Sequence, residues 1–207
     1  RLNLIALCHH PLAMETGLDP YERKLLLQSE SYALKNANHV VVTSQNTRKI
    51  LIKDFSISAS QITVALPGTD RYSFARCNGS PPKLLTCASL IKRKGHDILI
   101  EALREIHYLN WEARFVGDET LDPKWASELR DKVALSGLSA QIEFVGTVPN
   151  IAFEYQKADI FVLPSKFEGY GMVLSEAMAH GLPIISTRTG AIPEVVPESA
   201  GILVKSE

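Results

Sequence analysis

The 207-residue chain has few cysteines, no excess of charge of either sign and no long apolar run. Its three cysteines, Cys8, Cys77 and Cys87, are odd in number and lack CxxC spacing, which argues against a disulfide framework or a thiolate zinc site. The 22 basic and 23 acidic side chains leave no broad positive surface for nucleic acid. No apolar run approaches the roughly 18 residues that a membrane-spanning helix needs. We therefore expect a globular protein of the reducing cytoplasm, without a nucleic-acid partner.

The start of the chain lacks both an initiator methionine and a secretion signal. Arg1 is followed at once by Leu2–Cys8, an apolar run typical of a fully buried strand. Because a domain that opens inside a strand looks like part of a larger one, we expect further sequence upstream of Arg1.

Apolar strand runs alternate with amphipathic helices along nearly the whole length. Asp19-Pro20 with Glu22 is a helix start with a capping box, and Asn78–Pro82 is the stretch most typical of a linker. This alternation predicts an α/β fold with a doubly wound parallel sheet and helices on both faces. Strands are expected at 2–8, 39–44, 61–66, 83–89, 113–118, 141–146, 159–164, 183–187 and 201–204, and helices at 20–36, 47–55, 95–108, 122–136, 152–158, 171–180 and 192–196.

The most informative loop is SKFEGYGMVLSE, residues 165–176, which follows one of the predicted strands. In open parallel sheets, ligands lie at the carboxyl ends of strands beside helix N-termini. We expect the helix to begin at about Gly171, so that the amides of Gly171, Met172, Val173 and Leu174 point at a phosphate or diphosphate. Glu176 lies one turn further along, where a carboxylate can accept hydrogen bonds from a sugar diol.

Glu168 stands in the same loop ahead of the helix, and we expect it nearer the open cleft than Glu176. The alternative is that both are ordinary surface acids near a helix start, where acids are favoured in any case. Two glycines between them, which let the backbone come close to a ligand, favour the functional interpretation.

A second constellation is LIKRKGHD, residues 90–97, in which three basic residues follow a buried strand and precede a helix. Arg93 and Lys94 are placed to reach an anion over the edge of the sheet. The alternative is a solvated basic turn. The position of this loop favours a ligand role. Its cations and the amides of the 165–176 loop would both neutralise an anion such as a phosphate.

Two other groups are weaker candidates. Asp118, Glu119 and Asp122 suggest a divalent cation, but their spacing is irregular and Asp122 is a good helix cap, so we expect no metal site. His9 and His10 follow the first strand, where one of them is either a general base or sugar contact, or a buried structural histidine. His180 at a helix C-terminus is expected to be structural.

Taken together, these motifs resemble the donor site of retaining glycosyltransferases of the GT-B fold, in particular family 4 (glycosyltransferase group 1). The element EGYGMVLSE, with glutamates eight residues apart, is followed by AMAHGLPIISTRTGAIPEVV, and the resemblance extends to SLIKRKGHDILIEAL, FVGDE, IEFVGTVP and ADIFVLPS. It covers the chain from about Lys83 to the end in order, and is weaker over HHPLAMETG, ANHVVVTSQNTRKIL and ITVALPGTD.

The resemblance implies a division of the chain and a reaction. Residues 1–70 would be the C-terminal remnant of a Rossmann-like acceptor-side domain, 71–82 a linker, and 83–207 a Rossmann-like donor-binding domain truncated at its C-terminus. A hexosyl group would pass from a nucleotide-diphosphate sugar to a carbohydrate or lipid-linked acceptor with retention of anomeric configuration, with no metal or other cofactor. Polysaccharide biosynthesis is the natural setting, and any peripheral contact with the inner face of the membrane would lie in the absent N-terminal half.

The resemblance also assigns roles to single residues. Glu176 would bind the ribose hydroxyls, the amides after Gly171 and the Lys94 side chain would hold the diphosphate, and Glu168 would contact the transferred sugar. His10 would match the histidine beside the anomeric carbon, with His9 close enough to leave that assignment open. Many members carry Arg where this chain has Ser89, so Arg93 is expected to take over phosphate binding there.

The sequence leaves three rival functions. A glycosidase would use the two glutamates as acid and nucleophile, which fits poorly with Glu176 inside a helix that faces a phosphate site. A dinucleotide-dependent dehydrogenase lacks its GxGxxG after any strand. A non-catalytic nucleotide-sugar binding module, or a fragment that binds donor without turnover, is the serious alternative, because most acceptor contacts would lie in the absent half. The sequence does not reveal the donor base, the donor sugar, the acceptor or the oligomeric state.

Overall fold

The computed structural model describes residues 2–205, which form two units. The first unit contains the chain up to Gly68 together with Phe167–Gly171 and Gly190–Val195. The second contains Thr69–Lys166, Met172–Thr189 and the chain from Val196 onward. The first unit therefore includes two segments from the later part of the chain, and the division into residues 1–70, 71–82 and 83–207 stays a prediction.

The first unit is built on a three-stranded parallel sheet in the order β1-β2-β3. Val40 and Val42 of the middle strand are fully buried, and Leu34 and Leu51 from the two long helices belong to the same apolar cluster. The strands are β1 Ile5–Cys8, β2 His39–Val42 and β3 Ile62–Val64, and the helices are α1 Pro20–Asn36, α2 Gln45–Asp54 and the short α7 Ile192–Val195.

The first helix begins where its sequence signal predicts. Asp19 accepts hydrogen bonds from the amides of Tyr21 and Glu22, and the Glu22 carboxylate accepts one from the Asp19 amide. Both halves of the capping box are present, and Pro20 occupies the first helical position.

The expectation of a fully buried first strand is wrong. β1 covers only Ile5–Cys8, and the Ile5 and Leu7 side chains are 64% and 60% exposed. Within the described residues, β1 pairs with β2 alone and lies at the edge of its sheet, so one row of its apolar side chains is left uncovered. Apolar content predicted the strand, but neighbours determine burial.

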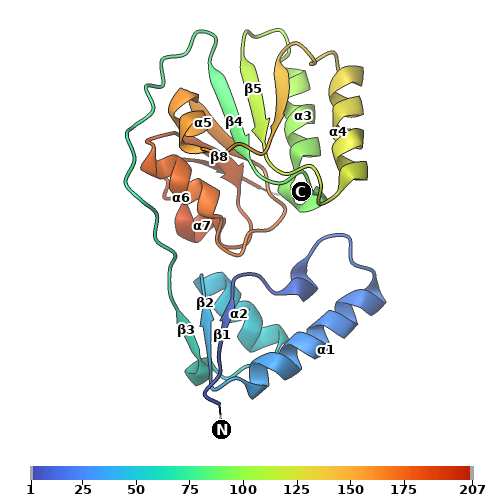
Figure 1. Ribbon diagram of the computed structural model, residues 1–207, viewed down its shortest axis with the longest axis vertical. Helices are drawn as coiled ribbons and strands as arrows, with labels where there is room; N and C mark the ends of the chain where they lie inside the picture. Colours follow the sequence, from blue (N-terminus) through green and yellow to red (C-terminus); the bar gives the residue numbers. More distant parts are fainter. Residues whose placement is uncertain (1, 206–207) are drawn as a thin grey trace. The chain divides into compact units, whose positions relative to one another are not determined.

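The second unit contains a six-stranded, wholly parallel sheet in the order β6-β5-β4-β7-β8-β9 (Figure 1). The chain winds outward through β4, β5 and β6, and then returns to the middle of the sheet to wind the other way. The strands are β4 Lys83–Cys87, β5 Glu112–Val116, β6 Ile142–Gly146, β7 Ile160–Leu163, β8 Ile184–Thr187 and β9 Gly201–Val204. The predicted doubly wound parallel sheet is confirmed.

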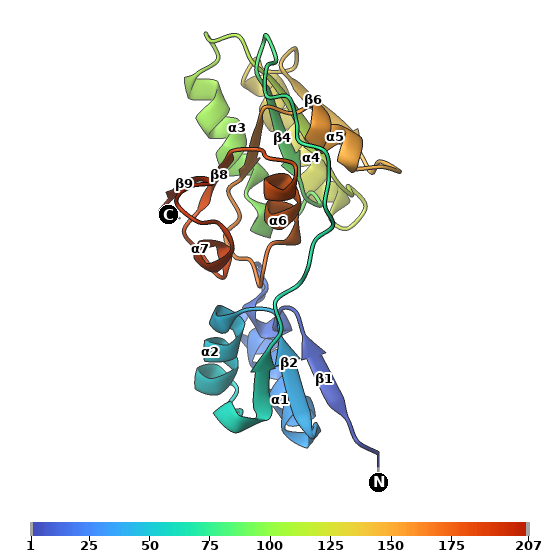
Figure 2. The ribbon, with the colours of Figure 1, turned by 90° about the vertical axis from the view of Figure 1, so that its left-hand side faces the viewer.

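Helices cover both faces of this sheet, as Figures 1 and 2 show. α3 (His96–Glu105) and α4 (Pro123–Leu135) pack on the face to which Val162 points, in one apolar cluster. Phe161 points to the opposite face, where its ring contacts Tyr155 of α5 (Ala152–Lys157). α6 (Met172–Ala179) contributes the fully buried Leu174 and Ala177.

The reversal of winding falls between β4 and β7. These strands pair directly, with Leu84 opposite Ile160, and the Thr86 hydroxyl donates to the Val162 carbonyl at 2.8 Å. A reversal of this kind opens a crevice at the carboxyl ends of the two strands. The loops that leave β4 and β7 are the two that the sequence singles out.

Two helix starts differ from prediction because of residues just before them. Gly95 adopts a left-handed conformation (φ 71°), so α3 begins at His96; it ends at Glu105, short of residue 108. α2 begins at Gln45, two residues earlier than expected, because the Ser44 hydroxyl caps the Thr47 amide at 3.0 Å.

The segment that was expected to be a linker is attached to the second unit. The Asp159 carboxylate accepts hydrogen bonds from the amides of Gly79 (2.8 Å) and Lys83 (2.7 Å). The Ala75 amide donates to the His180 carbonyl at 2.7 Å.

Candidate functional site

The basic loop and the loop after β7 meet at the winding reversal of the second unit. The Lys166 amide donates to the Arg93 carbonyl at 2.7 Å, and Lys166 Nζ lies 3.4 Å from Asp97 Oδ2. Residues more than 70 positions apart are thereby joined by a backbone hydrogen bond. The basic loop after β4 and the segment that leads from β7 into α6 therefore lie at the same edge of the sheet.

Gly95 allows this close approach. A Cβ atom at this position would lie 2.1 Å from the Pro164 carbonyl oxygen, and the φ of 71° is one that other residues rarely adopt. Glycine therefore allows the end of the basic loop to pass over the end of β7.

The basic residues of this loop have different surroundings. Lys92–Lys94 form a single 3-10 turn, in which Lys92 is exposed with its ammonium 5.4 Å from the centre of the Trp125 ring. Arg93, Lys94 and Ser89 are half-buried. Lys92 therefore faces Trp125, whereas Arg93 and Lys94 are the two cations that the sequence assigns to an anion.

The start of α6 differs by one residue from the prediction. The helix begins at Met172, so Gly171, with a φ of 92°, lies just before the first turn instead of within it. First-turn amides of a helix have no partner inside the helix, which leaves those of Met172, Val173 and Leu174 as the anion-binding candidates. Leu174 is fully buried and anchors this turn.

Glu176 is half-buried and receives a hydrogen bond that the sequence did not suggest. The Tyr155 hydroxyl donates to Glu176 Oε2 at 2.9 Å, and the Tyr155 ring stacks on His180, with centroids 4.8 Å apart. No spacing rule connects Tyr155 to Glu176, because the contact joins α5 to α6 across 21 positions. The only sequence signal was an aromatic residue on a short helix before a buried strand.

Glu168 and His10 both belong to the first unit. Glu168 is buried at 5% exposure, more deeply than the half-buried Glu176, and its place beside the open cleft stays a prediction. Its carbonyl accepts from the Ala191 amide at 2.9 Å, and a Cβ atom on Gly190 would lie 2.3 Å from that same oxygen. The backbone around Glu168 is therefore tightly held by the Gly190–Ala191 segment.

The His10 ring packs against the residue that precedes Glu168. Its centroid is 5.1 Å from that of Phe167, and its Nε2 lies 3.5 Å from Glu15 Oε2. His9, in contrast, is exposed. The choice between the two histidines stays open: the His10 ring packs against Phe167, and the His9 carbonyl oxygen lies so near Gly169 that a Cβ atom there would be 2.2 Å from it.

The acidic trio after β5 has structural partners. Asp118 accepts from the Thr120 amide and hydroxyl, each at 2.7 Å, Glu119 pairs with Arg130, and Asp122 caps α4 through the Trp125 amide. Among residues 2–205, no group of three or more His, Cys, Asp or Glu side chains is arranged to hold a metal ion. The three cysteines are all unpaired.

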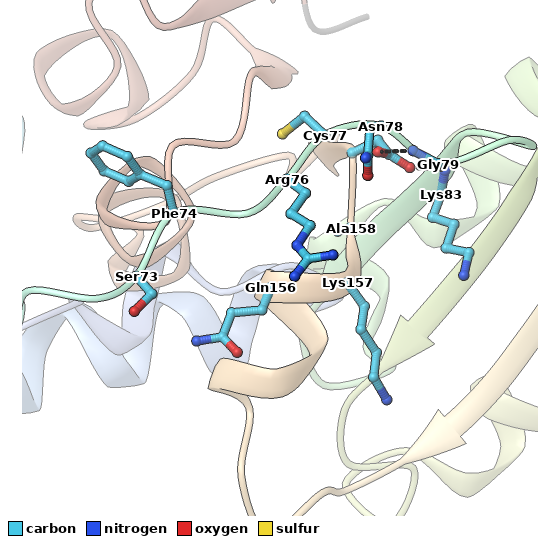
Figure 3. A pocket seen from close by; sticks show the side chains of 11 residues that line it. Ser73, Phe74, Arg76, Cys77, Asn78, Gly79, Lys83, Gln156, Lys157 and Ala158 are labelled. Carbon is cyan, nitrogen blue, oxygen red and sulfur yellow. Dashed lines mark hydrogen bonds between the residues drawn. The ribbon is translucent and has the colours of Figure 1, made fainter.

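A cavity of about 550 Å³ lies elsewhere in the second unit, where β4 begins and just before β7 (Figure 3). Arg76, Lys83 and Lys157 line it, together with the linker segment around Asn78. None of the predicted site residues contributes to its wall. It lies at the opposite end of the strands from the carboxyl ends of β4 and β7.

His96, the first residue of α3, is a buried titratable group that the sequence did not single out. It has no exposed surface, packs against the Phe115 ring, and neither ring nitrogen has a hydrogen-bond partner. Burial lowers the pKa of His96 to about 4; Asp97 opposes the shift and Lys94 adds to it. The folded protein therefore holds this imidazole neutral.

We expect His96 to make the fold sensitive to acid. Between pH 6.5 and about 4 the unfolded chain binds a proton that the folded chain excludes, so this contribution is complete above pH 6.5 and falls as the pH drops. The loss amounts to about 3 kcal/mol of unfolding free energy by pH 4. Urea unfolding of the wild type and of His96→Leu at several pH values should show a steeper decline for the wild type. The exposed-site control His107→Leu should follow the wild type; parallel profiles for the wild type and His96→Leu would refute the assignment.

Comparison with known proteins decides the family. The sequence profile described as "Glycosyl transferases group 1" matches residues 81–207. The chain belongs to the group 1 glycosyl transferases. The resemblance read from the motifs is thereby confirmed at the level of this family.

Relatives of this group 1 glycosyl transferase include enzymes with different products. The lipopolysaccharide core biosynthesis mannosyltransferase LpsB of Rhizobium meliloti is 32% identical over 68% of the chain and 43% of its own length. Mannosylfructose-phosphate synthase of Agrobacterium fabrum is 28% identical over 88% of the chain and 45% of its own. The chain thus spans less than half the length of these two curated relatives.

Solved structures share the fold. Sucrose-phosphate synthase from Thermosynechococcus elongatus superposes with a TM-score of 0.82 at 26% identity, covering 98% of this chain and 55% of its own. HepE from Anabaena, in complex with UDP and glucose, gives a TM-score of 0.82 at 23% identity over 97% of this chain and 57% of its own. The predicted GT-B type of α/β architecture is confirmed. No helix among residues 2–205 is both long and apolar enough to span a membrane.

Proposed function

We propose that this chain is the donor-binding part of a glycosyltransferase that transfers a hexosyl group from a nucleotide-diphosphate sugar. The supporting observation is the backbone hydrogen bond between Lys166 and Arg93 at the winding reversal. It joins the basic loop to the segment that leads into α6, at the position where parallel sheets bind nucleotides. The UDP complex of the structural neighbour HepE agrees with a donor of this class.

In this proposal the diphosphate is held without a metal ion. The first-turn amides Met172–Leu174 supply oriented donors, with Gly171 giving the close backbone approach, and Lys94 and Arg93 supply positive charge. Ser89 lines the start of the basic loop. These groups are fixed before the reaction, so they stabilise the negative charge that develops on the departing nucleoside diphosphate. Glu176 accepts hydrogen bonds from the ribose diol.

The sugar-transfer step would use residues of the first unit. We propose that Glu168 contacts the transferred sugar and that His10 lies beside the anomeric carbon, with the acceptor attacking from the side of departure so that configuration is retained. The acceptor would be a carbohydrate or a lipid-linked sugar. A cytoplasmic location, with peripheral contact at the inner face of the membrane, also stays a prediction.

A screen of nucleoside diphosphates tests donor binding. Thermal shift with UDP, GDP and ADP should show stabilisation by at least one of them, because a ligand that binds only the folded state stabilises it by an amount that grows with the ratio of its concentration to Kd. Lys94→Ala should weaken that binding about 10- to 100-fold, as expected for a hydrogen bond to a charged group. Lys92→Ala is the matched control and should bind as the wild type does, since Lys92 faces Trp125. Equal losses in both variants would count against the assignment.

The alternative is a module that binds the donor without turnover, or an inactive fragment of such an enzyme. A turnover assay of this chain with donor and acceptor panels separates the two. Sugar transfer would establish catalysis by these 207 residues, whereas donor binding without transfer would favour the binding module.

A further inference from the structure

Among residues 2–205, the polar contact of the Glu176 carboxylate is on one side. The Tyr155 hydroxyl donates to Oε2 at 2.9 Å and approaches the Val173 carbonyl at 3.3 Å. A glutamate side chain has three rotatable bonds, so one fixed hydrogen bond removes much of its freedom. It also leaves Oε1 and the remaining lone pairs of Oε2 for a ligand.

The Tyr155 ring is itself immobilised. Tyr155 has no exposed surface, and its ring lies between Phe161 at 5.8 Å and His180 at 4.8 Å, the latter nearly parallel at 20°. His180 in turn stacks on Tyr72 at 4.3 Å. All these residues belong to the second unit. The hydroxyl therefore has little freedom to move away from Glu176.

The tautomer of His180 is set by the same helix. Its Nδ1 lies 2.8 Å from the Glu176 carbonyl oxygen, which can only accept, so Nδ1 carries the hydrogen. The His180 ring is thus hydrogen-bonded to the backbone of Glu176, and the Tyr155 hydroxyl is hydrogen-bonded to the side chain of the same residue. Backbone and side chain of Glu176 are fixed by two stacked aromatic residues.

Tyr155 remains a donor under all ordinary conditions. Burial, with further contributions from the Cys87 thiol and the Glu176 carboxylate, raises the pKa of Tyr155 far above its usual value. Burial likewise raises the pKa of Cys87, so the neighbouring thiol stays neutral. The Tyr155 hydroxyl therefore keeps its hydrogen, and the Glu176 carboxylate, at 2.9 Å, is nearer to it than the Val173 carbonyl, at 3.3 Å.

We propose that Tyr155 is a positioning residue for donor recognition: its hydroxyl orients the Glu176 carboxylate toward the ribose diol of the nucleotide. The inference rests on the proposed function, in which Glu176 binds ribose. The hydroxyl does not touch the donor; it lowers the cost of ordering a flexible acid when the diol binds. Loss of the hydroxyl should therefore reduce only the part of the affinity that depends on the diol.

The test compares Tyr155→Phe with the wild-type chain, using UDP and GDP, each beside its 2′,3′-dideoxy analogue. The wild type should prefer the natural nucleotide. Tyr155→Phe should lose about tenfold in affinity for the natural nucleotide and less than twofold for the analogue, because the phenyl ring keeps the stack. The exposed-site control Tyr108→Phe should change neither. In a Glu176→Ala background, Tyr155→Phe should have no further effect.

The outcomes separate the two claims. A wild type that binds neither nucleotide, or that shows no preference for the diol, overturns the assignment of Glu176 and the inference with it. A wild-type preference that Tyr155→Phe retains in full overturns the positioning role alone. Equal losses for natural and dideoxy nucleotides would make Tyr155 a structural residue and overturn it as well.

Discussion

Replacing Glu176 with alanine is expected to lower the affinity for the preferred nucleoside diphosphate by a hundredfold or more. Two hydrogen bonds from a ribose diol to one carboxylate are each worth about 1.5–3 kcal/mol, and about 1.4 kcal/mol corresponds to tenfold. Because the ribose is remote from the reacting carbon, the loss should appear in the dissociation constant more than in the turnover number. Isothermal titration with UDP and GDP measures it directly.

The control for this variant is Glu128→Ala, which removes a half-exposed glutamate from α4. The partner of Glu128 is the exposed Lys124, with Oε1 and Nζ 3.9 Å apart. It should leave nucleotide binding unchanged. The unliganded melting temperature of Glu176→Ala should be recorded as well, because the Tyr155 hydroxyl loses its carboxylate partner. A Glu176→Ala chain that is folded and binds nucleotide within threefold of the wild type would remove the basis for a ribose contact.

The second large effect is expected at Gly95. Alanine there would place its Cβ atom 2.1 Å from the Pro164 carbonyl oxygen, and a backbone atom cannot move aside as a flexible side chain can. Together with the left-handed φ of 71°, this should lower the free energy of unfolding by about 2–4 kcal/mol. Nucleotide affinity should fall too, because relief of the clash separates the basic loop from the end of β7.

Gly137 offers a matched control. It has the same φ of 71°, but a Cβ atom there would meet nothing within 4 Å. Gly137→Ala should therefore cost only the conformational part, about 1 kcal/mol. Urea unfolding gives the free energy of unfolding of both variants, and the difference between their losses measures the cost of the clash. Equal costs at the two positions would contradict the close approach of the two loops.

Local patterns predicted the elements well because the relevant interactions lie within a few residues. The capping box at Asp19 and the alternation of apolar strands with helices depend on near neighbours, and both were read from the sequence. The joining of two distant ligand loops was also foreseen, because the carboxyl ends of parallel strands share one edge.

The rest depends on packing, which no local pattern records. The exposure of Ile5 and Leu7 follows from the strand order, and the Glu168 backbone is held by Gly190 and Ala191, which lie more than 20 positions further along the chain. The Tyr155–Glu176 hydrogen bond joins two helices that the sequence places far apart. A left-handed Gly171 moved the start of α6 by one residue.

The family was readable from ordered motifs, whereas the roles of single residues stay predictions. Ser89, Arg93 and Lys94 lie in the loop after β4, where a diphosphate is expected, and their contact with it stays a prediction. The same holds for Glu168 and His10, which both belong to the first unit. The His10 ring packs against Phe167, and Glu168 is the next residue along the chain.

A crystal structure of the chain with UDP or GDP tests the account most directly. We predict the pyrophosphate oxygens within hydrogen-bond distance, about 2.7–3.2 Å, of the first-turn amides of α6 and of Lys94 Nζ, with both ribose hydroxyls on Glu176. A nucleotide bound instead among Arg76, Lys83 and Lys157, with the α6 turn unoccupied, would contradict it.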